Sequence, residues 1–102
     1  VGGMVPIALG TAMAIKRSGA DEHVWLFIGD MAAESGIVYE TLKYSHNFQL
    51  PISFVVEDNG VSVLTSTREV WGLDTPNYVV DVRRFKYQSK FPHVGAGKRV
   101  QF

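Results

Sequence analysis

The chain has 102 residues, of which 46% are hydrophobic and 20% charged, a composition typical of one folded domain. Ten basic residues balance ten acidic ones, which argues against nucleic-acid or anionic-membrane partners because both need clustered positive charge. The lack of cysteine excludes disulfides and thiolate sites, and no apolar run approaches the roughly 20 residues of a membrane-spanning helix. We expect one domain over residues 1–102, a partial one, in a reducing compartment such as the cytoplasm.

The first predicted element is a helix over residues 3–16, rich in small and aliphatic side chains. Pro6 is acceptable in a first turn, Lys16 suits a last turn, and Gly19 ends the helix. Its circumference is apolar nearly all round, which predicts burial on more than one side.

Residues 24–56 predict a strand, a helix and a second strand. The runs 24–28 and 52–56 are mostly apolar, which is typical of strands covered on both faces. Between them, residues 34–48 carry apolar side chains at helical spacing. Such a unit is normally a right-handed crossover between parallel strands, so we expect an α/β fold.

The rest of the chain predicts less regular structure. Residues 61–70 indicate a loop in which Ser66 or Thr67 caps a short turn. Residues 78–87 indicate a third strand. Residues 88–102 form a basic, glycine-containing tail that we expect to cross a neighbouring surface.

Polar residues follow both apolar strands. Gly29 and Asp30 come after the first strand, and Asn59 and Gly60 follow the second. Ligands of parallel α/β sheets bind beyond the carboxyl ends of the strands. Asp30 and Asn59 should therefore meet at one edge of the sheet, within reach of one ion.

These residue types suit magnesium, which prefers oxygen ligands and fills its remaining positions with phosphate and water. Asp30 offers a carboxylate, Asn59 an amide oxygen, and a turn at Gly60 would let the Val61 carbonyl face inward. Backbone amides at residues 31–32, near a helix start, would meet an anion. A metal-bridged diphosphate fits this arrangement.

Each residue alone also has an ordinary structural explanation. An Asp after a strand commonly caps a helix or forms a turn. Asp58-Asn59-Gly60 alone would indicate a hairpin turn. The metal hypothesis depends on the conjunction of two strands, each ending in an oxygen ligand beside a glycine.

The same residues resemble the signature of thiamine diphosphate enzymes, in which Gly-Asp-Gly is followed by Asn-Asn. Gly29-Asp30-Met31 and Asp58-Asn59 reproduce that spacing. Residues 2–10 also look like the segment before the signature in the alpha subunit of 2-oxo acid dehydrogenases, members of the transketolase-like superfamily. The similarity is best over residues 1–67.

This resemblance implies a truncated three-layer α/β fold, a parallel sheet with helices on both faces. It implies that Asp30 and Asn59 bind magnesium through their side chains, and Val61 through its carbonyl. The residues that would line the diphosphate of thiamine diphosphate are Gly29, Met31 and Ala32.

Two residues depart from the signature. Met31 replaces its second glycine, so the backbone there must reach the cofactor with the side chain pointing away. Asp58 replaces its first Asn and adds negative charge near a diphosphate, which the metal would have to offset unless Asp58 faces elsewhere.

In such families the cofactor lies between two domains, usually from different chains. The resemblance therefore implies a pyrimidine-binding, beta-subunit-like partner in a homo- or hetero-oligomer, and no activity from this chain alone. The reaction would be decarboxylation or dehydrogenation of a 2-oxo acid, or ketol transfer. The alternative is a non-catalytic assembly subunit that has lost productive cofactor binding. A mononucleotide-binding domain is disfavoured because the chain has no G-x-G-x-x-G turn and no phosphate-binding loop.

No catalytic residue is assigned from the sequence, although His93 could handle substrate, because related alpha subunits have histidines in a loop near the active site. A solvated tail histidine is the competing interpretation of His93. The remaining titratable and aromatic residues indicate structural roles. They are Glu34 and Glu57, His23 and His46, and the packing residues Trp25 and Trp71.

Overall fold

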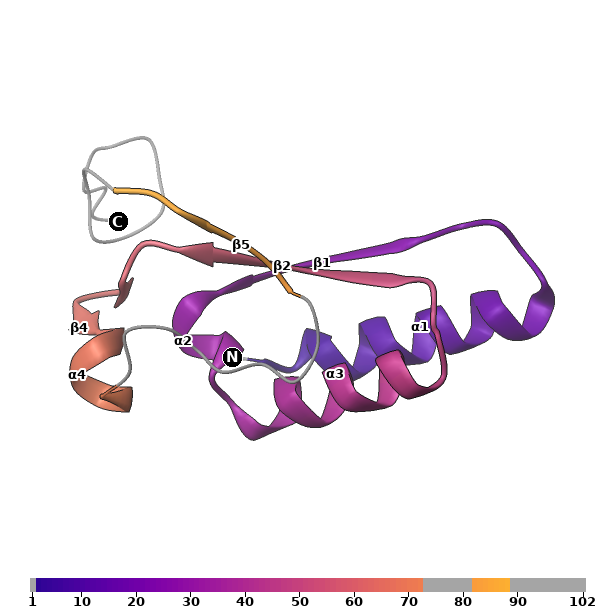
Figure 1. Ribbon diagram of the computed structural model, residues 1–102, viewed down its shortest axis with the longest axis horizontal. Coiled ribbons are helices and arrows are strands. Elements are labelled where there is room, and N and C mark those ends of the chain that lie inside the picture. The colour runs from indigo at the N-terminus through magenta and orange to yellow at the C-terminus, as the bar shows by residue number, and fades with distance from the viewer. Residues whose placement is uncertain (1, 73–81, 89–102) are drawn as a thin grey trace, which may run out of the picture.

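The computed structural model describes residues 2–72 and 82–88 of the chain (Figure 1). The elements, in chain order, are α1 (Met4–Ser18), β1 (Val24–Gly29), α2 (Asp30–Ala33), α3 (Gly36–Asn47), β2 (Ile52–Asp58), β3 (Val61–Ser62), β4 (Thr65–Ser66), α4 (Thr67–Trp71) and β5 (Arg83–Lys86). Strands β1, β2 and β5 form one sheet in that order, and β3 and β4 form a small separate pair.

The main sheet is parallel throughout, as the strand–helix–strand pattern predicts. Strand β1 pairs with β2 from Val24↔Ile52 to Gly29↔Glu57, and β2 pairs with β5 up to Asp58↔Lys86. All three strands therefore end at the same edge of the sheet. Both predicted strands are also longer than expected, because β1 continues through Gly29 and β2 continues through Glu57 and Asp58.

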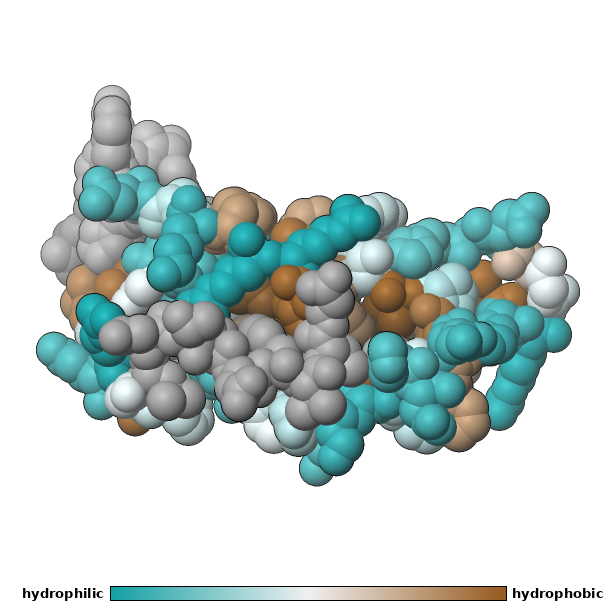
Figure 2. All heavy atoms as spheres, in the orientation of Figure 1, coloured by the Kyte–Doolittle hydropathy of each residue, from teal (hydrophilic) through white to brown (hydrophobic). Residues whose placement is uncertain are grey.

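The core lies between this sheet and helices α1 and α3, which run side by side on one of its faces (Figure 1). Side chains alternate along a strand, so Leu26 and Ile28 of β1 share this face with Phe54 and Val56 of β2. The core cluster also includes Val5, Ala33, Val38 and Leu42. In Figure 2, hydrophobic side chains show between the sheet and the helices, with hydrophilic ones around them.

The opposite face of the sheet is open among the described residues. Trp25 is 49% exposed and Phe27 is 53% exposed, and the Arg83 guanidinium lies 4.8 Å from the centre of the Trp25 ring. The prediction that both strand faces are covered is therefore met on one face only within residues 2–72 and 82–88. The second helical layer stays a prediction.

Helix α1 is buried on one side rather than on several. Val5 and Ala12 are fully buried, whereas Ile7 is 70% exposed. Within the described part of the chain, α1 contacts α3, β1 and β2, and burial of its other side stays a prediction. The helix ends as predicted, because Gly19 adopts the left-handed backbone of a C-cap, with φ at 71°.

The second predicted helix is present, and a separate helical turn precedes it. We expected one helix over residues 34–48, and the chain forms α3 over Gly36–Asn47 after the single turn α2, which was not predicted. Ser35 separates them because it has extended backbone, with φ at −76° and ψ at 147°, and its hydroxyl donates to the Ala32 carbonyl. Serine favours this position before a helix.

Past Asn59 the structure is more regular than the predicted loop. Strands β3 and β4 form an antiparallel pair, and Ser66 caps α4 by accepting a hydrogen bond from the Glu69 backbone N–H. Strand β5 lies within the predicted 78–87 strand. Residues 78–81, and the tail residues 89–102 with His93, lie outside the described residues. Over the described ranges, no helix combines the length and apolar character needed to cross a membrane.

Candidate functional site

An open cleft of about 590 Å³ lies at the edge where the sheet's strands end. Asp30 and Asn59, the two predicted metal side chains, both line it. The other lining residues come from the end of β2, the start of α4 and β5 with the residues after it: Asp58, Gly60, Ser66, Thr67, Arg68, Arg84, Lys86, Tyr87 and Gln88. The parallel register thus brings together residues that are far apart in the sequence.

Asp30 is positioned at the start of α2 and is only 3% exposed. The Thr67 hydroxyl donates a hydrogen bond to its Oδ2. The Thr67 backbone N–H donates to the Gly60 carbonyl at 3.0 Å. Thr67 therefore connects the end of β1 to the turn after β2, and its hydroxyl gives the buried carboxylate a neutral partner.

The turn after β2 is held by two side-chain oxygens. Asp58 Oδ1 accepts from the Gly60 N–H at 3.0 Å, and Asn59 Oδ1 accepts from the Val61 N–H at 3.1 Å. Gly60 has φ at 76°, the left-handed conformation that glycine adopts without strain. The predicted turn is thus present. Val61 begins β3 behind the turn and does not line the cleft in the described part of the chain.

The predicted diphosphate residues lie next to Asp30 along the chain. Gly29 is exposed, and a Cβ built there would meet no atom within 4 Å. Met31 lies in α2 and is not among the described non-glycine residues with positive φ. Its Sδ accepts a hydrogen bond from Trp71 Nε1 at 3.1 Å, so its side chain is directed to α4. Whether the Met31 backbone reaches a diphosphate stays a prediction.

Asp58 is 6% exposed and forms an ion pair that the sequence reasoning missed. Arg84 of β5 donates to Asp58 Oδ2 from Nε at 2.9 Å and from Nη2 at 2.7 Å. Its third nitrogen, Nη1, is buried and has no hydrogen-bond partner among the described residues. Arg84 pairs with Val56 in the sheet, so its charged side chain lies on the covered face, while its neighbours along β5 are exposed. That alternation was the available signal.

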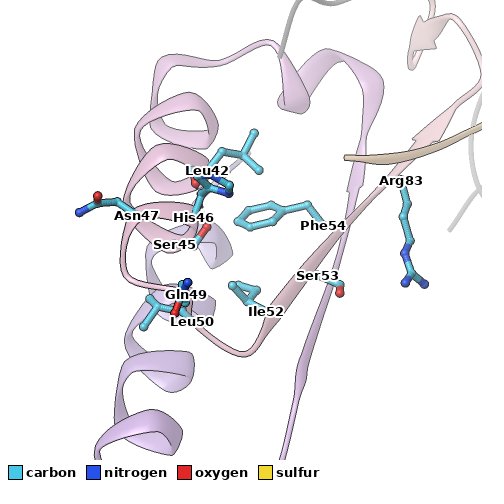
Figure 3. Close-up of a pocket in the computed structure, with 10 residues that line it drawn as sticks. All are labelled: Leu42, Ser45, His46, Asn47, Gln49, Leu50, Ile52, Ser53, Phe54 and Arg83. Atoms are coloured by element: carbon cyan, nitrogen blue, oxygen red, sulfur yellow. Dashed lines mark hydrogen bonds between the residues drawn. The ribbon is translucent and has the colours of Figure 1, made fainter. Parts of the chain in front are cut away.

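A second pocket, of about 520 Å³, lies between the end of α3 and the start of β2 (Figure 3). Ile52 and Phe54 point from the strand towards the helix, whereas Asn47 points away. His46 lines this pocket. It is at the opposite end of β2 from Asp58, whereas ligands of parallel sheets bind at the carboxyl ends.

The histidines and glutamates that the sequence left in structural roles remain apart from the cleft. His23 is exposed and its Nε2 lies 2.9 Å from Ser53 Oγ, and neither Glu34 nor Glu57 lines the cleft. In the ranges that the structure describes, no cluster of three or more His, Cys, Asp or Glu side chains could hold a metal. A cation in the cleft would therefore need ligands beyond carboxylates, as a magnesium–phosphate complex has.

Comparison with known proteins agrees with the resemblance read from the sequence. A family model described as the dehydrogenase E1 component matches residues 1–80. The pyruvate dehydrogenase E1 component subunit alpha of Rickettsia prowazekii (strain Madrid E) is 39% identical over 66 residues, which are 65% of this chain and 20% of that protein. The mitochondrial somatic form of that subunit from Macaca fascicularis is 36% identical over 66 residues, which are 65% of this chain and 17% of that protein.

This chain thus spans about a fifth of the length of the curated relatives it matches. The family match nevertheless covers most of the chain and includes both strand ends that line the cleft. The chain belongs to the dehydrogenase E1 component family.

Proposed function

We propose that this chain holds the magnesium-bound diphosphate of thiamine diphosphate in an enzyme that acts on a 2-oxo acid. One observation carries the proposal. In a member of the dehydrogenase E1 family, buried Asp30 and Asn59 line one cleft at the carboxyl edge of a parallel sheet. This is where α/β sheets bind their ligands.

The residues present fit such a group. Magnesium takes one or two carboxylates from a protein and completes its octahedron with phosphate and water. Asp30 would supply the carboxylate and Asn59 an amide oxygen, so the fit rests on these two residues. The Val61 carbonyl is the third proposed ligand, although Val61 does not line the cleft in the described part of the chain. The diphosphate would lie over Gly29, where a side chain would find only open space, beside the backbone of Met31 and Ala32.

The rest of the active site would come from a partner. The relatives are named as alpha subunits of a pyruvate dehydrogenase component, which supports a beta-like chain that contacts the pyrimidine half of the cofactor. Thiamine diphosphate supplies the carbanion chemistry when bound, and protein groups bind and orient it. This chain's share is to hold the diphosphate through Asp30 and Asn59.

Titration calorimetry of the full chain with its partner tests the proposal. We expect thiamine diphosphate to bind with magnesium present and to lose that binding in EDTA. Asp30→Ala should weaken binding by at least about a hundredfold, since even residues that only support a metal ligand change affinity by 10–100-fold. Asp21→Ala, a change to an exposed loop carboxylate, is the matched control and should bind as the wild type does.

Two results would count against the proposal in different ways. A wild-type complex with no magnesium-dependent binding would favour the non-catalytic assembly subunit. Wild-type binding that Asp30→Ala leaves unchanged would retain the cofactor and remove Asp30 as a ligand.

A further inference from the structure

We infer that Arg84 is a positioning residue of the diphosphate site, and that its ion pair with Asp58 replaces the neutral Asn of the thiamine diphosphate signature. This inference rests on the proposed function and deepens it. It concerns the departure at Asp58, which places a negative charge beside a site for an anionic cofactor. The pair explains how such a site tolerates that charge.

The two carboxylate oxygens of Asp58 accept hydrogen bonds from different partners. Two of the three Arg84 guanidinium nitrogens, Nε and Nη2, donate to Oδ2 at 2.9 and 2.7 Å, and leave Oδ1 to accept from the Gly60 N–H at 3.0 Å. The Asp58 carbonyl accepts from the Tyr87 N–H at 2.9 Å, which keeps β5 alongside β2 to the end of the strand. Arg84 therefore holds Asp58 in the orientation that closes the turn carrying Asn59.

The electrostatic argument follows from the register. Gly29 pairs with Glu57, so Asp30 and Asp58 are the next residues on neighbouring strand ends, and both are nearly fully buried. Unpaired carboxylates placed so close repel each other and any phosphate between them. The guanidinium of Arg84 cancels the formal charge of Asp58. Of the two buried aspartates at this edge, only Asp30 then has a neutral hydroxyl as its partner, as it would with Asn at position 58.

The charged partner also distinguishes the two strand ends chemically. An arginine–carboxylate contact through two nitrogens is strong and fixed in geometry, whereas a hydroxyl partner, such as Thr67 on Asp30, is neutral. Both carboxylate oxygens of Asp58 thus have hydrogen-bond donors within the protein. Asp30 remains the carboxylate that a cation can use.

A double-mutant cycle on the full chain with its partner tests this inference. The proteins are the wild type, Arg84→Met, Asp58→Asn and the double variant, each titrated with thiamine diphosphate at saturating magnesium. Arg84→Met should weaken binding about tenfold or more, because it leaves a buried, unpaired charge beside the diphosphate. Asp58→Asn should tighten binding by about threefold, and the double variant should return to within about threefold of the wild type.

Arg83→Met is the matched control, because Arg83 is the neighbouring arginine on the open face of the sheet and should leave the affinity unchanged. Unfolding by urea identifies variants that are not folded. If Arg84→Met is one of them, Arg84→Lys takes its place in the cycle. It should bind more weakly than the wild type and be rescued by Asp58→Asn.

The outcomes separate this inference from the function on which it rests. A double variant as weak as Arg84→Met, or a lysine variant that Asp58→Asn does not rescue, would overturn the role of the pair while leaving cofactor binding intact. Absence of magnesium-dependent binding in the wild type would overturn both.

Discussion

The ends of β1 and β2 are alike in topology and different in chemistry. Each parallel strand finishes with a buried aspartate at the same edge of the sheet, Asp30 just after β1 and Asp58 as the last residue of β2. Asp30 receives a hydrogen bond from a threonine hydroxyl, and Asp58 receives two from an arginine. The two aspartates have the same carboxylate group, so the difference between their chemical roles comes from their hydrogen-bond partners.

This difference shows how a sheet edge with two buried carboxylates can offer only one of them to a ligand. A buried carboxylate needs a partner, and a guanidinium satisfies both its hydrogen bonding and its charge. A hydroxyl satisfies only the hydrogen bonding. Asp58 is therefore a structural group that holds β5 and the turn at Gly60, while Asp30 keeps its charge facing the cleft. Changes that exchange or remove these partners should act differently at the two ends.

The largest expected effect on stability is at the β2 end. Arg84→Met leaves Asp58 buried without its cation, and breaking a buried pair in this way costs about 3 kcal/mol or more. We expect the free energy of unfolding in urea to fall by about that amount for the protein without cofactor. Arg83→Met, which removes only a contact over the exposed Trp25 ring, should cost less than about 1 kcal/mol.

Asp58→Asn in the Arg84→Met background should recover much of the lost stability, because no unpaired charge then remains. Equal losses for the two arginine variants would show that the ion pair contributes nothing measurable. The two strand ends would then be alike in energy as well as in topology.

The sequence predicts the β1 end well because its signals are local. An apolar run, a glycine and an aspartate follow one another, and the next strand repeats the pattern with Asn59 and Gly60. Parallel pairing then places both ends at one edge without further information. The match of residues 1–80 to the family confirms what the flanking residues 2–10 indicated.

The partners of the two aspartates could not be predicted because they depend on contacts distant in sequence. Thr67 reaches Asp30 only once the β3–β4 turn brings α4 back to the edge, and Arg84 reaches Asp58 only in the register of β5. The turn α2 was missed because four residues are too few to show helical spacing. The open sheet face was missed because an apolar run shows that a strand can be covered, not what covers it.

The effect at the β1 end should be smaller and should depend on the cofactor. Thr67→Val keeps the shape of the side chain and removes the hydroxyl that donates to buried Asp30, at a cost of about 1–2 kcal/mol of unfolding free energy. This loss should shrink when magnesium and thiamine diphosphate are bound, because the ion then interacts with the carboxylate. Urea unfolding with and without both ligands measures the difference.

Thr65→Val, a change to an exposed threonine of β4, is the control for Thr67 and should have little effect in either condition. A Thr67→Val loss that is identical with and without ligands would mean that the hydroxyl and the ion act on Asp30 independently. That result would weaken the view that Asp30 is the carboxylate available to a cation.

The smallest expected effects come from the glycines beside the two aspartates, and they should be opposite in kind. Gly60 has φ at 76°, so Gly60→Ala should cost about 1 kcal/mol of stability, because a Cβ is strained in that conformation. Gly29 has φ at −72° and open space around a built Cβ, so Gly29→Ala should leave stability unchanged. That same Cβ would enter the space proposed for the diphosphate and should weaken thiamine diphosphate binding. Urea unfolding and titration calorimetry of both variants would separate the two roles, and a Gly29→Ala protein that binds as tightly as the wild type would move the diphosphate away from the end of β1.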